Sequence, residues 1–126
     1  MPRTNYDLLR TMIDHWNAHD VEHYYGLLHD NYREHLNGVL VKNGRADARD
    51  ADQFLYDTLL DYRSEVDDLY ADDYGGAIRW RFIGTGPAGR FELPVASFYR
   101  ITAGKIAECW QYGDAVANAH ALGLDQ

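Results

Sequence analysis

Residues 98–110 have the sequence FYRITAGKIAECW, in which the segment Thr102-Ala103-Gly104-Lys105 separates two runs of aromatic and aliphatic residues. A short glycine-containing segment between two such runs is typical of a β-hairpin. We therefore predict antiparallel strands at residues 91–101 and 106–112. Immediately upstream, residues 77–83 alternate apolar with basic side chains, which predicts a further strand with one buried face.

The preceding part of the chain is predicted to contain mainly helices. Apolar residues recur at steps of three and four over residues 5–18, which predicts an amphipathic helix, and a short second helix fits residues 21–28. Residues 30–41 look extended and end at a turn at residues 42–44, before a third helix over residues 46–62. Helices followed by antiparallel strands are the pattern of an α+β domain.

Length and composition restrict the class of protein. A chain of 126 residues with 46% hydrophobic residues predicts a single domain over residues 1–126. The net charge of -8 argues against nucleic acid or an anionic membrane as partner. No apolar run approaches the ~20 residues that span a bilayer, so we expect a cytoplasmic protein. Cys109 is the only cysteine, which excludes an internal disulfide, and its apolar neighbours favour inert packing.

Two motifs suggest ligand sites but have simpler interpretations. Residues 84–89, GTGPAG, match G-x-G-x-x-G, but a predicted strand follows them. Dinucleotide binding needs a helix N-terminus there, so we favour a hairpin turn. His15, His19 and His23 have the spacing of metal ligands on one helix face, but Asp20 interrupts the helix. We therefore favour a polar helix face and expect no metal site.

Charged residues on the predicted strands also have two interpretations. Four acids lie in or after a weakly alternating stretch at residues 64–72: Asp67, Asp68, Asp72 and Asp73. They lack the pattern of a calcium-binding loop and favour a solvated edge strand. Arg79 and Arg81 share one face of their strand. Either they line a cavity and bind a carboxylate or enolate oxygen, or they balance the acids on an exposed face.

One set of residues has the chemistry for proton transfer. His35 follows the second predicted helix, Asp114 ends the last predicted strand, and Tyr99 and Gln111 lie on the last two strands. A histidine and a carboxylate that meet at a cavity are the minimal groups for proton transfer on a bound organic molecule. Their spacing alone favours a structural role.

The order of several short motifs, from about residue 8 to residue 123, resembles that of the SnoaL-like polyketide cyclases of the nuclear-transport-factor-2-like superfamily. The motifs are Trp16-Asn17-Ala18-His19-Asp20, Leu28-His29-Asp30-Asn31-Tyr32 with His35, Asn43-Gly44-Arg45, residues 98–110, and Ala119-His120-Ala121-Leu122-Gly123. The resemblance implies a cystatin-like α+β cone, in which three N-terminal helices cover a curved antiparallel sheet. It also implies a pocket open at one end and a homodimer.

The resemblance further implies a small-molecule enzyme without a cofactor, which performs cyclase- or isomerase-type proton transfer on a carbonyl-rich organic substrate. His35 would transfer the proton, Tyr99 and Gln111 would donate hydrogen bonds to the oxyanion, and Asp114 would orient a partner or act as an alternative base. The residues expected to bind substrate in the pocket, beside His35, are Trp16, Tyr24, Tyr32, Phe54, Arg81, Tyr99 and Gln111.

Alternatives to cyclase chemistry stay open at this stage. Gln111 and Ser97 stand where the cyclases have a catalytic aspartate and a histidine, so the cone could be a non-catalytic domain that binds a small ligand. A cone filled by Trp16, Phe54 and Trp80 would instead be a dimerisation scaffold. Limonene-epoxide hydrolases and ketosteroid isomerases share the architecture, so hydrolysis and isomerisation are also open.

Overall fold

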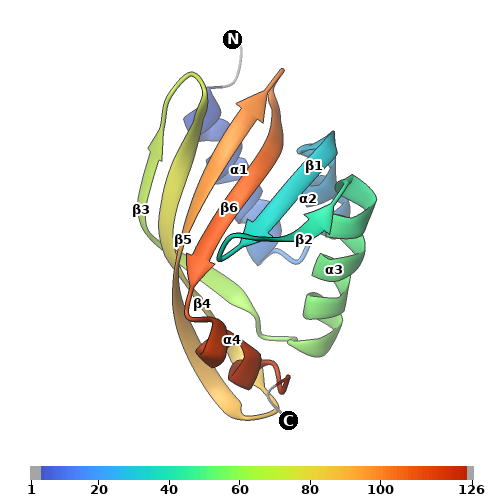
Figure 1. Ribbon diagram of the computed structural model, residues 1–126, viewed down its shortest axis with the longest axis vertical. Helices are drawn as coiled ribbons and strands as arrows, with labels where there is room; N and C mark the ends of the chain where they lie inside the picture. Colours follow the sequence, from blue (N-terminus) through green and yellow to red (C-terminus); the bar gives the residue numbers. More distant parts are fainter. Residues whose placement is uncertain (1–3, 125–126) are drawn as a thin grey trace.

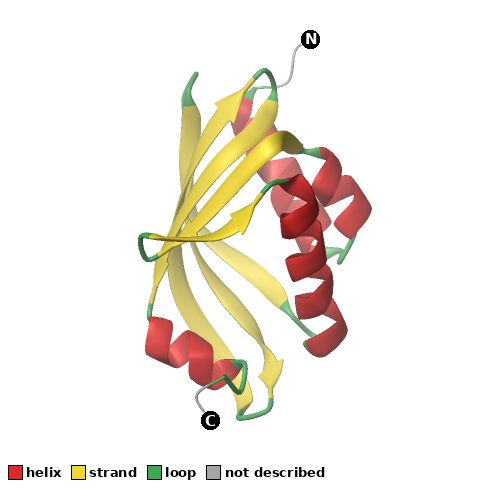
Figure 2. Cartoon of the chain, turned by 45° about the vertical axis from the view of Figure 1, so that its right-hand side comes forward, coloured by secondary structure: helices red, strands yellow, loops and turns green. Residues whose placement is uncertain are grey.

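The computed structural model of the protein describes residues 4–124, which form one curved six-stranded sheet with helices packed against it (Figure 1). The helices are α1 (Asn5–Asn17), α2 (Val21–Gly26), α3 (Arg45–Thr58) and α4 (Ala115–Ala121). The strands are β1 (Leu28–Leu36), β2 (Val39–Asn43), β3 (Arg63–Ala71), β4 (Gly75–Gly86), β5 (Gly89–Thr102) and β6 (Lys105–Gly113). Their order in the sheet is β2-β1-β6-β5-β4-β3. Figure 2 shows α1, α2 and α3 on one side of this sheet, and the predicted α+β class is confirmed.

Both hairpins predicted from glycine-containing segments are present. β5 and β6 pair antiparallel up to Thr102 and Lys105, and the two residues between them, Ala103 and Gly104, have φ values of 52° and 73°. Positive φ at both central positions is the feature of a tight hairpin turn that suits glycine. The G-x-G-x-x-G segment closes the β4–β5 hairpin, where Gly86 pairs with Gly89. The prediction of a turn at this segment is therefore confirmed.

The stretch predicted as one extended segment, residues 30–41, is a hairpin instead. β1 ends at Leu36, and Asn37 and Gly38, with φ values of 50° and 85°, turn the chain into β2. Asn-Gly is a strong hairpin signal, and here it overrides the apolar run that follows it. A second difference concerns β1 and β6, which pair parallel, so the sheet is mixed rather than wholly antiparallel.

The core lies between the three N-terminal helices and the inner face of the sheet. The buried face of α1 consists of Leu8, Leu9, Met12, Ile13 and Trp16. α1 packs closely on β4, because a Cβ added at Gly76 would lie 2.6 Å from Leu9 Cδ1. Inner-face residues of the sheet complete this cluster, among them Ile78 and Ile106. Among residues 4–124, no helix covers the other face of the central strands (Figure 2).

The acidic stretch lies on an edge strand, as predicted. β3 is the last strand of the sheet, and Arg79 on the adjacent β4 forms ion pairs with Asp67 and Asp68. Charges on an exposed edge discourage pairing with a further strand. Within residues 4–124, none of the helices has the length and apolar composition needed to span a bilayer.

Candidate functional site

A cavity of about 170 Å³ lies between the inner face of the sheet and the helices. Its aromatic lining consists of Trp16, Tyr24, Tyr62, Trp80, Phe82, Phe91 and Tyr99. Its aliphatic lining consists of Leu36, Val41, Leu55, Leu93 and Leu122, and its polar lining consists of Glu34, Lys42, Gln111 and Asn118. An apolar cavity with a few polar groups is the usual form of a small-molecule site.

The aromatic wall is built around the end of α1. The indole ring of Trp16 packs against Tyr24 of α2 and Tyr62, which precedes β3, at centroid distances of 5.4 Å and 5.7 Å. Trp80 and Phe82 are two residues apart on β4 and both face inward, and their rings meet edge to face with centroids 5.1 Å apart. Such tilted and edge-to-face aromatic pairs are mutually stabilising, and their rings give the cavity an apolar wall.

Three charged side chains meet on the opposite wall. Glu34 of β1 and Lys42 of β2 are directly opposite in the hairpin register, so they share one face. Lys42 Nζ lies 3.1 Å from Glu34 Oε2 and 2.8 Å from Oδ1 of Asp52, which comes from α3. Tyr32 Oη donates a hydrogen bond of 2.6 Å to Glu34 Oε1. The side chains of Glu34 and Lys42 are 13% and 12% exposed, and that of Asp52 is fully buried.

Burial sets the charge states of this group. Burial raises the pKa of Asp52, Lys42 opposes that rise, and Glu34 adds to it. For Lys42, burial alone would lower the pKa, but Asp52 and Glu34 outweigh it and raise the pKa above its usual 10.5. Lys42 is therefore a cation at neutral pH, held between two carboxyl groups. Asp52 Oδ2 is buried without a hydrogen-bond partner among the described residues.

Hydrogen-bond donors line the sheet side of the cavity. Trp80 Nε1 donates to Ser97 Oγ at 3.1 Å, and Ser97 Oγ donates to Gln111 Oε1 at 3.4 Å. This chain directs the carbonyl of Gln111 to the sheet and leaves its amide N–H groups for a ligand. Burial raises the pKa of Tyr99 well above its usual value, so its phenol stays protonated and can donate a hydrogen bond.

Four of the residues predicted to bind substrate line the cavity: Trp16, Tyr24, Tyr99 and Gln111. Tyr32 does not line the cavity, but its hydroxyl donates a hydrogen bond to Glu34, which does. Phe54 lies on the outer face of α3 and is 66% exposed, whereas its neighbour Leu55 faces the cavity. The expectation that Phe54 lines the pocket is corrected by the helical register.

Arg81 also lies away from the cavity, on the outer face of the sheet. Along β4, Trp80 and Phe82 face inward, so Arg81 points to the other side. Its guanidinium binds Glu92 at 2.6 Å, Glu65 at 3.1 Å and Asp67 at 3.2 Å. Of the two interpretations of the arginines, the exposed face that balances the acids is the one observed.

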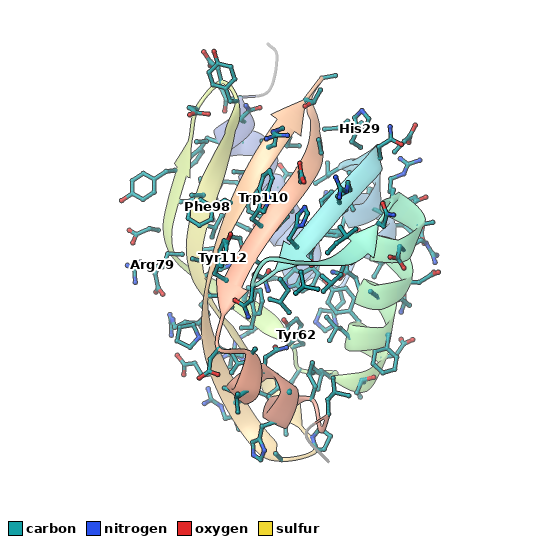
Figure 3. All side chains as sticks on the ribbon, viewed as in Figure 1. His29, Tyr62, Arg79, Phe98, Trp110 and Tyr112 are labelled. Atoms are coloured by element: carbon teal, nitrogen blue, oxygen red, sulfur yellow. The ribbon has the colours of Figure 1, made fainter. Side chains whose placement is uncertain are left out.

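His35 and Asp114 are not brought together in the cavity. Since Glu34 and Leu36 face inward on β1, His35 faces outward, where Nε2 lies 2.7 Å from Glu108 Oε2. The imidazole stacks on Trp110 at 5.6 Å, and Figure 3 shows Trp110 on the sheet face away from α1. Asp114 accepts a hydrogen bond of 3.0 Å from Ala117 N as the N-cap of α4, and it lines a separate chamber of about 110 Å³.

The three histidines at four-residue spacing, His15, His19 and His23, do not converge on one point. His15 and His23 stack at 5.3 Å, whereas His19 Nε2 lies 2.5 Å from the backbone oxygen of Tyr62. In the described part of the chain, no group of three or more His, Cys, Asp or Glu side chains is arranged to hold a metal ion. None of these histidines lines the cavity, whose ionisable side chains are Glu34, Lys42, Tyr24, Tyr62 and Tyr99.

Comparison with known proteins identifies the family. The model of the SnoaL-like domain matches residues 9–109. Similar solved structures include IdmH from Streptomyces antibioticus, a proposed polyketide cyclase, with 22% identity, coverage of 96% of this chain and 99% of that chain, and a TM-score of 0.80. A cystatin-fold protein from Novosphingobium aromaticivorans has 19% identity, coverage of 87% and 98%, and a TM-score of 0.79.

A protein from Catenulispora acidiphila with a ketosteroid isomerase-like fold, in complex with trimethylamine, has 14% identity, coverage of 94% and 93%, and a TM-score of 0.78. At these identities the structural matches establish the fold alone. Among the curated proteins, no relative matches the chain. The match of the family model over residues 9–109, together with a fold shared over nearly the whole chain, shows that this protein belongs to the SnoaL-like domain family.

Proposed function

We propose that this protein is a small-molecule enzyme that transfers a proton on a carbonyl-containing organic substrate, with Glu34 as the general base. The observation that carries the proposal is the Glu34 carboxylate, which lines the aromatic cavity beside a lysine that remains charged. A general base must reach the proton that it removes, and Glu34 is the carboxylate that lines the main cavity. We therefore assign to Glu34 the role expected for His35.

The group of Glu34, Lys42 and Asp52 suits proton removal from a neutral substrate. With both carboxyl groups ionised it carries a net charge of one negative unit. When Glu34 takes the proton from the carbon next to a carbonyl, its negative charge passes to the enolate oxygen, so the total charge in the cavity is unchanged. The Lys42 ammonium and the amide of Gln111 are donors to that oxygen. Return of the proton from Glu34 to another carbon gives isomerisation. Attack of the enolate carbon on a second carbonyl gives cyclisation, in which the proton on Glu34 passes to the alkoxide oxygen that forms.

Gln111 supports a donor role rather than a basic one. An amide cannot take up a proton near neutral pH, but its N–H groups donate hydrogen bonds. The contact with Ser97 fixes the amide so that it can bind the oxygen on which charge develops. The same residue is the observation that favours the second candidate function, a domain that binds a small ligand without changing it.

Deuterium exchange tests the proposal directly, because it reports removal of the proton whichever product then forms. The protein is incubated in deuterated buffer with a set of enolisable aryl ketones, and uptake of deuterium at the carbon next to the carbonyl is followed by NMR. We expect Glu34→Gln to lower the exchange rate about 100-fold or more. His35→Gln is the matched control on the other face of the same strand and should retain the wild-type rate.

Equal loss in the two variants, or none in Glu34→Gln, would contradict the assignment of the base. Binding of these ketones without exchange by the wild-type protein would favour the ligand-binding domain. The homodimer expected from the family stays a prediction, which the exposed aromatic residues Phe98 and Tyr112 on the outer face of the sheet support (Figure 3). Light scattering on the purified protein measures the oligomeric state directly.

A further inference from the structure

We infer that the substrate extends through two adjoining chambers, with a ring-bearing head beside Glu34, its carbonyl group where the two chambers meet, and an uncharged apolar tail of a few carbon atoms beneath α4. The position of the head rests on the proposed function, whereas the position of the tail rests on the shape of the cavity. The main cavity of about 170 Å³ and a second chamber of about 110 Å³ share four lining residues, which are Leu36, Leu93, Gln111 and Asn118. We call these shared residues, which border both chambers, the waist.

The two chambers differ in chemistry. The main cavity presents aromatic rings together with the Glu34–Lys42 pair. Beyond the residues shared with the main cavity, the second chamber is lined by small and aliphatic residues, including Pro94, Val95, Ala115 and Ala117, and by the polar side chains of Asn37, Glu92 and Asp114. Aliphatic walls without aromatic rings suit a flexible alkyl chain more than a flat ring system. A molecule with a compact ring at one end and a short alkyl chain at the other matches both walls.

The waist carries two amide side chains. Gln111 and Asn118 both border the two chambers, and Ser97 holds the carbonyl of Gln111. A few polar groups in a largely apolar pocket fix the orientation of a ligand by binding its polar atoms. This places the carbonyl oxygen of the substrate at the waist, between the ring and the tail.

Charge excludes an acidic tail. Two carboxylates line the second chamber, and neither faces a cation inside it. Glu92 binds Arg81 of the outer face, and Asp114 caps α4. A tail that ends in a carboxylate would bring a third negative charge to this chamber, with loss of its hydration. The tail is therefore uncharged.

The size of the chambers limits the substrate to a small molecule. Both together are smaller than the roughly 300–1,000 Å³ of a typical site for a drug-sized ligand. The second chamber, at about 110 Å³, is the smaller of the two and suits a tail of only a few carbon atoms. Gly113 helps to form this space, because a Cβ there would lie 2.8 Å from Val95 Cγ1. The substrate class is thus an aryl ketone, or a similar ring with a carbonyl group, that bears a short neutral alkyl chain.

The test is a homologous series of phenyl alkyl ketones, from acetophenone to heptanophenone, with the dissociation constant measured by titration calorimetry. We expect the affinity for the wild-type protein to rise about fourfold with each added methylene and to level off when the second chamber is full. A heptanophenone analogue with a terminal carboxylate should bind about tenfold more weakly or worse. Independence of affinity from chain length, or no binding of the whole series, would overturn the inference.

Variants on α4 separate the two chambers. Ala117→Phe fills the second chamber and should abolish the dependence on chain length while acetophenone binds as before. Val116→Phe is the matched control, because Val116 is exposed on the same helix. Should Ala117→Phe fail to fold, Val95→Phe fills the same chamber from the sheet. Wild-type chain-length dependence in a folded chamber-filling variant would also overturn the inference.

The outcomes distinguish this inference from the proposed function. Glu34→Gln should lose deuterium exchange but keep the dependence on chain length, because it leaves the second chamber intact. Loss of the chain-length effect with normal exchange would remove the second chamber and leave the catalytic proposal standing. Normal chain-length dependence without exchange in the wild-type protein would remove the catalytic proposal alone.

Discussion

Replacement of Lys42 by methionine tests whether the charged group on the cavity wall is organised as described. The substitution keeps an unbranched side chain that is only one atom shorter, but removes the ammonium that lies 2.8 Å from Asp52 and 3.1 Å from Glu34. Both carboxyl groups are then left without a cation, one of them fully buried and the other 13% exposed. Removal of one partner from a buried ion pair costs about 3–5 kcal/mol, because the remaining charge is desolvated and unpaired.

The free energy of unfolding should therefore fall by about 3–5 kcal/mol at pH 7, out of the roughly 5–15 kcal/mol that a domain of this kind has. Urea unfolding followed by tryptophan fluorescence measures this change. An exposed ion pair supplies the matched control. Arg49→Met breaks the contact with Glu22 on the surface and should barely move the urea midpoint.

The pH dependence gives the sign of the effect. In the wild-type protein Lys42 lowers the pKa of Asp52, so its removal raises that pKa further above 3.8. The folded variant then binds more protons than the unfolded chain, and its stability rises as the pH falls from 7 toward 4. The raised pKa of Lys42 in the wild-type protein means that its stabilisation is complete below pH 10.5 and is lost progressively as the pH rises from 10.5 toward the higher pKa of the folded state.

A double substitution tests whether the loss comes from the unpaired buried charge of Asp52. Lys42→Met combined with Asp52→Leu replaces the buried pair by apolar groups and should recover much of the lost stability. The reasoning would be refuted if Lys42→Met behaved like Arg49→Met at pH 7, or if its deficit did not shrink in acid. Either result would mean that water reaches these carboxyl groups and screens them.

Three further predictions concern other parts of the molecule. Cys109 is buried and burial raises the pKa of its thiol, so it should not react with a thiol reagent at pH 8 until the protein is unfolded in urea. Tyr56→Phe removes the hydrogen bond of 2.9 Å to the backbone oxygen of Trp16 and should cost about 1 kcal/mol in urea unfolding. Gly86→Ala would drive a Cβ into the backbone oxygen of Ala121, so hydrogen exchange in α4 should become faster.

These predictions have simple controls. Tyr70→Phe changes an exposed tyrosine and should leave the stability unchanged. Gly26→Ala meets no atom within 4 Å and should not affect α4. Rapid reaction of Cys109 in the native protein would show that the inner face of β6 is open to solvent. Slow exchange in α4 of Gly86→Ala would show that the helix end can shift without loss of contact.

The fold was predictable because the signals that specify it are local. The turn at Thr102-Ala103-Gly104-Lys105 and the alternation of residues 77–83 need only a few neighbouring residues to be recognised. The α1 stripe of apolar residues, which includes Trp16, is equally local. The β1–β2 hairpin had its own local signal in Asn37-Gly38, and the apolar run of residues 39–41 obscured it.

The candidate site was predicted only in part, because the facing of a strand depends on its register. Assigning His35 to the cavity placed its neighbour Glu34 outside, and a shift of one residue reverses every side chain of a strand. Tyr32, which is buried two residues before Glu34, has the parity that could have identified the cavity face. On α3, the sequence likewise does not show whether Phe54 or its neighbour Leu55 faces the cavity. Tertiary packing turns Leu55 inward and leaves Phe54 exposed.

Local patterns in the chain were enough to specify the three N-terminal helices, most of the strands, the acidic surface and the apolar character of a core, whereas α4 was not predicted from them. The meeting of Lys42 of β2 with Asp52 of α3, next to Glu34 of β1, arises instead from packing in three dimensions. Because Glu34, Lys42 and Asp52 come from three different elements, their spacing along the chain matches no single helical or strand period. In the sequence, each of these charged residues therefore looks like a surface residue. Packing of α3 on the hairpin removes these charges from water, and burial is what makes their mutual contacts strong and their chemistry available.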